Sequence, residues 1–147
     1  MVYTAIAVLL FITDGIIKYY VEEKGKAGEN LPALHGKLIV RKYHNTGAML
    51  DIGSKNQPLV AMLSLLFTVF MTGVYVATLG RKGKTLLKTG LALILGGAYS
   101  NTYDRLKRKY VVDYVSFPVK NKKIRNVVFN ISDFGIIIGS IILVLSS

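Results

Sequence analysis

The feature that most constrains this chain is a stretch of 23 residues, Pro58 to Gly80, that carries no charged side chain. A helix of this length is about 34 Å long at 1.5 Å per residue, which exceeds the roughly 30 Å hydrocarbon core of a bilayer. An uncharged run this long is typical of a membrane-spanning helix. The remaining elements must therefore lie in or beside a membrane.

Three further apolar stretches indicate a bundle of such helices. The chain is 52% hydrophobic and only 18% charged, which is typical of a membrane protein. The first stretch lacks the basic start and the small residues of a cleaved signal peptide, so we expect a retained helix. Residues 1–147 are expected to form a single membrane-embedded, mainly α domain with four transmembrane helices, at about 1–21, 58–80, 86–103 and 127–146.

The segments between these helices differ in length. Those at about 24–57 and 104–126 are long and fall on the same side of the membrane, whereas the turn Arg81 to Thr85 is short. The β-branched and aromatic residues in Lys37 to Tyr43 indicate a small strand or hairpin on the membrane surface. Val111 to Phe117 has a similar pattern and could pair with it.

Composition excludes several function classes. The chain has no cysteine, which rules out disulfides, zinc–thiolate sites and thiol nucleophiles, and two histidines are too few for a histidine-based metal site. The net charge of +11 could indicate nucleic acid binding. Apolar runs lie between the basic segments, however, so anionic phospholipid headgroups are the better partner and nucleic acid is not expected. The basic residues also favour cytoplasmic long segments, so charge alone leaves the topology open.

Two aspartates flank the predicted helices where charge is costly. The chain has only eight acidic residues; Asp113 closes a segment that has just left one helix, and Asp133 opens the last. An acid at membrane depth is a functional-site hypothesis, and two that converge could share a proton and activate water as in an aspartic protease. The alternative is a surface acid and an ordinary acid at a helix N-terminus.

Other polar residues lie near the same side of the membrane. Asp14 and Lys18 are four apart and can pair, most simply as an interfacial ion pair. Asn45 to Ala48 is a polar turn, although the Asn45 amide could instead hold a substrate backbone. Asn130 could cap the last helix or orient a carboxylate.

Small residues predict close helix packing in the last two helices. Gly96 and Gly97 precede the polar group Asn101, Asp104 and Arg105, and Gly135 and Gly139 form a Gly-x-x-x-Gly pair. Asp104 and Arg105 form either a structural ion pair or part of a site.

Taken in order, these motifs resemble the signal peptidase II family over nearly the whole chain. The motifs that carry the resemblance are Asp14 with Lys18, Asn45-x-Gly47-Ala48, Gly96-Gly97-Ala98-x-x-Asn101-x-x-Asp104-Arg105, Val111-Val112-Asp113-Tyr114 and Phe129-Asn130-x-x-Asp133. The resemblance implies four transmembrane helices with cytoplasmic termini in a bacterial cell membrane. It also implies an extracytoplasmic β-cradle between the first two helices and a catalytic pair, Asp113 and Asp133, at the outer face.

The resemblance further implies the reaction and the supporting residues. One aspartate would activate a water molecule and its protonated partner would polarise the scissile carbonyl. The substrate would be a prolipoprotein, cut before its lipid-modified cysteine, with no metal or cofactor. The residues implied to shape the pocket and hold the substrate are Asp14, Lys18, Asn45, Gly47, Asn101, Asp104, Arg105 and Asn130.

The chain departs from the usual family pattern at Gly15, at Met49 to Asp51, at Ser100 and at Ser132, which is compatible with a divergent member of altered substrate range. A small four-helix transporter is an alternative, but it would place an acid near the middle of the bilayer. A catalytically inactive homologue that binds lipoproteins or lipid is another alternative, although both aspartates are retained.

Overall fold

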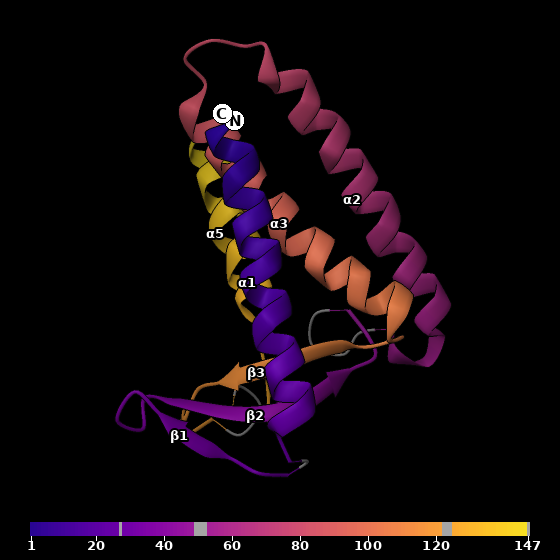
Figure 1. Ribbon diagram of the computed structural model, residues 1–147, viewed down its shortest axis with the longest axis vertical. Coiled ribbons are helices and arrows are strands. Elements are labelled where there is room, and N and C mark those ends of the chain that lie inside the picture. Colours follow the sequence, from indigo (N-terminus) through magenta and orange to yellow (C-terminus); the bar gives the residue numbers. More distant parts are fainter. Residues whose placement is uncertain (27, 49–52, 122–124, 147) are drawn as a thin grey trace.

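The computed structural model describes residues 1–26, 28–48, 53–121 and 125–146. Long helices lie side by side, a small sheet covers one end of them, and both chain termini lie at the other end (Figure 1). The helices are α1 (Val2–Lys24), α2 (Gln57–Leu79), α3 (Thr85–Lys107) and α5 (Ile131–Leu145), with a short 3₁₀ helix at Ser54–Asn56. The strands are β1 (Leu31–Ala33), β2 (Leu38–Asn45) and β3 (Val111–Ser116).

The helix α3 is the centre of the molecule and packs against α1, α2 and α5. Small residues permit this packing. A methyl group added at Gly96 would lie 2.7 Å from the carbonyl oxygen of Ala7 in α1, and one added at Gly139 would lie 2.6 Å from that of Gly90 in α3. The predicted role of these glycines in close helix packing is confirmed.

Within the described residues, two helical segments are long and apolar enough to cross a membrane, Val2–Lys24 and Ser54–Leu79. Only 11% and 22% of their most apolar windows are buried inside the protein, whereas the core helix of a soluble protein would be mostly buried. Their apolar side chains therefore face outward, which suits lipid. That four helices span the membrane stays a prediction.

The last two helices differ from the expected ranges. The helix α3 extends to Lys107, so Asp104 and Arg105 are helical and not part of a loop. The helix α5 begins at Ile131 instead of residue 127, because Phe129 pairs with Val115 of β3 and Asn130 caps the helix. Pairing with a strand that is distant in sequence thus keeps the apolar residues before Asn130 out of the helix.

The sheet has the order β1-β2-β3 and is antiparallel throughout. The hairpin expected between the first two helices forms, and the segment after α3 pairs with it as predicted. The cradle is therefore not confined to the connection between the first two helices, since β3 follows α3. The register places Tyr43 opposite Asp113 and Asn45 opposite Val111, which brings the end of β2 to the catalytic candidates.

Candidate active site

The structure brings Asp113 and Asp133 to one cavity of about 230 Å³. Asp113 lies in β3 and is 1% exposed, and Asp133 lies in the first turn of α5. Residues of α2, α3, α5 and β3 line the cavity. Two different elements, the buried strand β3 and the start of α5, thus supply the two acids.

Asn130 joins the two aspartates. Its side-chain Nδ2 donates to Asp113 Oδ1 at 2.6 Å, while its Oδ1 accepts from the backbone N–H of Asp133 at 2.9 Å. The backbone N–H of Asn130 donates in turn to Asp133 Oδ2 at 3.0 Å, which completes a capping box. Asn130 therefore caps α5 and orients a carboxylate at once.

Two further amides hold the pair. Asn45 Nδ2 donates to Asp113 Oδ2 at 2.9 Å, and Asn101 Nδ2 donates to Asp133 Oδ1 at 2.9 Å. The Asn45 oxygen accepts from the backbone N–H of Gly47 at 3.0 Å, so this segment is the turn expected from sequence. Its NH₂ group has two N–H donors, of which one is directed at Asp113, and Asn45 also lines the cavity. That this amide holds a substrate backbone stays a prediction. Each of the four carboxylate oxygens thus receives an N–H donor.

The surroundings of Asp113 favour a bound proton. Burial, reinforced by the nearby charge of Asp133, raises the pKa of Asp113 to about 7, while the amides of Asn45 and Asn130 oppose this shift. A carboxyl group with a pKa near neutrality can hold or release a proton at physiological pH.

Of the two alternatives for Asp104 and Arg105, the structural ion pair is not found among the described ion pairs. Neighbouring residues of a helix point in different directions. Asp104 instead contacts Lys18 at 3.1 Å and Arg108 at 3.6 Å. Arg105 lines the cavity and donates to the carbonyl oxygen of Gly47 at 2.9 Å, which ties the Asn45 turn to α3.

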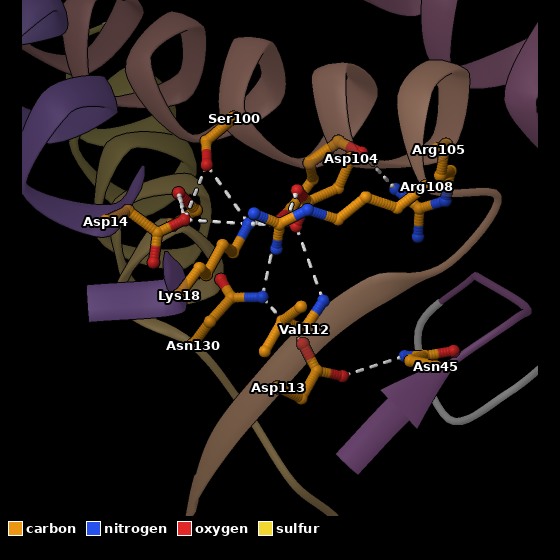
Figure 2. Close-up of polar contacts among 12 residues, drawn as sticks. Asp14, Lys18, Asn45, Ser100, Asp104, Arg105, Arg108, Val112, Asp113 and Asn130 are labelled. Carbon is orange, nitrogen blue, oxygen red and sulfur yellow. Dashed lines mark hydrogen bonds and ion pairs between the residues drawn. The ribbon is translucent and has the colours of Figure 1, made fainter. Parts of the chain in front are cut away.

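A buried polar cluster around Lys18 lies on the side of Asp113 that faces α1 and α3 (Figure 2). Lys18 and Asp14 form the expected ion pair at 2.8 Å, but they are 1% and 0% exposed, so it is not the interfacial pair expected from sequence. Ser100 and Ser132 both donate to Asp14 Oδ2, at 2.6 and 2.5 Å. Neither Asp14 nor Lys18 lines the cavity, so they act on the site only through the residues that they contact.

Sequence reasoning missed Tyr114 as a member of this cluster. Its hydroxyl donates to Asp14 Oδ1 at 2.8 Å and accepts from the backbone N–H of Ile131 at 3.1 Å. Successive strand residues point to opposite faces, so Tyr114 must face away from Asp113. That alternation was the available signal. Ser100 and Ser132 were recognised only as departures from the family pattern.

The remaining cavity wall is largely apolar, with Phe67, Ile136 and Ile137 among its residues. Within the described ranges, no group of three or more His, Asp or Glu side chains is arranged to hold a metal ion.

The departure from the family pattern at Met49 to Asp51 lies outside the described residues. The other departure, Gly15, is exposed on α1 and has open space beside it.

Comparisons with known proteins agree with the sequence resemblance. A family model described as Signal peptidase (SPase) II matches residues 6–147. A lipoprotein signal peptidase of Halothermothrix orenii is 32% identical over 99% of this chain and 93% of its own length. The corresponding protein of Trichormus variabilis is 36% identical over 96% and 85%.

Two solved structures described as bacterial membrane enzymes have the same fold. One has a TM-score of 0.83 and covers 99% of this chain and 86% of that chain. The other has a TM-score of 0.80 and covers 99% and 91%. Both are 22% identical to this chain in sequence, so the comparison with them establishes the fold alone.

Proposed function

This chain belongs to the signal peptidase II family, a family of proteases, and from that membership we propose that it is an aspartic endopeptidase acting on lipid-modified prolipoproteins. It cuts the peptide bond that precedes the lipid-modified cysteine and releases the signal peptide. The observation that carries this proposal is the meeting of Asp113 and Asp133 in one cavity, with every carboxylate oxygen held by an N–H donor.

The proposed chemistry uses one proton on the pair. The ionised carboxylate takes a proton from water as the water oxygen bonds to the scissile carbonyl carbon, and the protonated partner donates a hydrogen bond to the carbonyl oxygen. Collapse of the tetrahedral intermediate breaks the C–N bond, and a proton from the pair passes to the leaving amine. The amide donors fix the two carboxyl groups throughout.

The cavity wall supports a substrate that arrives from the bilayer. Phe67 of α2 and Ile137 of α5 line the cavity and are 45% and 39% exposed, so the apolar wall is open at these positions. An apolar signal peptide and a lipid-modified cysteine suit such an edge, because they leave hydrocarbon for another apolar surface. Substrate thus approaches between α2 and α5.

We place the protein in the bacterial cell membrane, with the sheet and the aspartates on the extracytoplasmic side. The sheet and the termini lie at opposite ends of the helices, so both termini are then cytoplasmic (Figure 1).

This orientation can be tested because the chain has no cysteine of its own: Ser54→Cys should react with an impermeant thiol reagent added to intact cells and Ser146→Cys should not. The reverse pattern would overturn the orientation.

The function is tested with purified protein in detergent micelles and a synthetic prolipoprotein segment carrying a diacylglyceryl cysteine. Mass spectrometry should find one cut, directly before the modified cysteine. The same segment without the lipid should be cut far more slowly, because the lipid supplies apolar binding energy. Failure to cut the lipidated segment under conditions where the protein remains folded would reject the proposal.

The value of kcat/KM should depend on pH, because the proposed reaction needs one proton on the pair of aspartates. The pKa of Asp113 is raised to about 7, so the pair loses its last proton as pH rises through that region and kcat/KM should fall about tenfold per unit above it. The Asn45 amide lowers this pKa, so Asn45→Ala should move the alkaline midpoint to higher pH. A rate that stays constant up to pH 9, or an Asn45→Ala midpoint shifted downward, would contradict the assignment.

A further inference from the structure

The ammonium group of Lys18 is surrounded by acceptors. Its Nζ lies 2.8 Å from Asp14 Oδ2, 3.1 Å from Asp104 Oδ2 and 3.0 Å from Ser100 Oγ, and it donates to Asn101 Oδ1 at 2.9 Å. An ammonium has three N–H donors and no acceptor. With four acceptors around three hydrogens, Lys18 is held in one position.

This arrangement fixes the amide of Asn101. An ammonium cannot accept a hydrogen bond, so the Asn101 oxygen must face Lys18 and the NH₂ group must face Asp133. Asn130 Nδ2 lies 3.2 Å from the same Asn101 oxygen and reinforces this orientation. If the amide turned over, its NH₂ group would face two donors and Asp133 would lose one.

The position of Lys18 is in turn fixed from three elements. Asp14 lies one helical turn before it on α1 and accepts from Ser100 of α3, Ser132 of α5 and Tyr114 of β3. Ser100 and Ser132 directly precede Asn101 and Asp133 in the chain. The cluster therefore fixes the position of α1 relative to α3 and α5, the helices that carry Asn101 and Asp133.

We propose that Lys18 is a positioning residue for the reaction, which acts through Asn101 to keep an N–H donor on Asp133; this rests on the proposed function. Lys18 is 1% exposed and does not line the cavity, so it makes no contact with substrate there. Its loss should therefore lower kcat and leave KM nearly unchanged.

A matched pair of substitutions tests this role. Lys18→Met alone leaves the buried Asp14 carboxylate without a cationic partner and risks unfolding, so each substitution is combined with Asp14→Asn. Glutamine and methionine have similar lengths, but only glutamine has an N–H donor to offer the Asn101 oxygen. With the lipidated segment as substrate, kcat of Asp14→Asn/Lys18→Met should be about 10-fold to 100-fold below that of Asp14→Asn/Lys18→Gln, with equal KM.

The effect must also depend on Asn101. When Asn101→Leu is added to both double variants, the difference in kcat between glutamine and methionine at position 18 should disappear, as measured in single turnovers with excess enzyme.

The control is the same comparison at Lys88, whose ammonium contacts the carbonyls of Leu79 and Arg81. Lys88→Gln and Lys88→Met should have equal kcat.

The inference is overturned if the two double variants have equal kcat, if they differ in KM alone, or if their difference persists without Asn101. Melting temperatures confirm that the compared proteins are folded. Cleavage by the unaltered protein separates the two proposals, because its absence rejects the proposed function, whereas its presence with equal variants rejects only the role of Lys18.

Discussion

Asp113→Asn and Asp133→Asn are each expected to lower kcat for the lipidated prolipoprotein segment by about 10⁴-fold. Asparagine has nearly the shape of aspartate, but it can neither take a proton from water nor return one to the leaving amine. Either substitution therefore removes one half of the acid–base pair and leaves the cavity in place. The measurement is product formation by mass spectrometry, with long incubations for the variants.

The control for these variants is Glu29→Gln, which makes the same change from acid to amide at an exposed position outside the cavity. It should cleave at the rate of the unaltered protein. All three variants should elute from size exclusion as the unaltered protein does. Turnover within tenfold of that protein by either aspartate variant would refute the catalytic pair.

Lys18→Met alone is expected to lower the free energy of unfolding by about 3–5 kcal/mol, enough to unfold many domains. The substitution removes the ammonium that contacts Asp14 at 2.8 Å and Asp104 at 3.1 Å, and both carboxylates are buried. Asp14 then has no cation beside it, and Asp104 keeps only Arg108 at 3.6 Å. Buried charges that are so poorly compensated are costly because the surroundings cannot solvate them. Thermal unfolding in detergent should show a much lower midpoint.

The double variant shows whether the unpaired charge is responsible. Asp14→Asn/Lys18→Met removes the most closely paired carboxylate as well and should recover a large part of the lost stability. Lys88→Met, a change of the same kind at a lysine whose contacts are exposed carbonyls, should shift the midpoint little. A single Lys18→Met variant as stable as Lys88→Met would contradict the ion-pair account.

Local patterns in the sequence predicted much of the fold. The uncharged run identified α2, and small residues at Gly96 and Gly139 identified close helix contacts. The β-branched residues after the first helix identified a hairpin. These features depend on periodicity and residue size over short windows, which is why one sequence suffices to find them.

The remainder depended on partners distant in the chain. The start of α5 moved to Ile131 because Phe129 pairs with a strand that its own neighbourhood does not reveal. The nearer of the two cations beside Asp104 is Lys18, which lies in α1 and not in the neighbouring sequence. Likewise Tyr114 could be assigned to Asp14 only once β3 was placed over α1. Tertiary structure, not local preference, decides such contacts.

The packing of α2 has a consequence for how this enzyme can diversify. This helix packs chiefly on α3, and it contributes Ser64, Phe67 and Thr68 to the cavity wall. Among the described hydrogen bonds, those that reach Asp113 and Asp133 come from β2, α3 and the Asn130 cap, and none comes from α2. Substitutions in α2 can therefore change which substrates fit the cavity and leave the hydrogen bonds that hold the proposed catalytic pair in place.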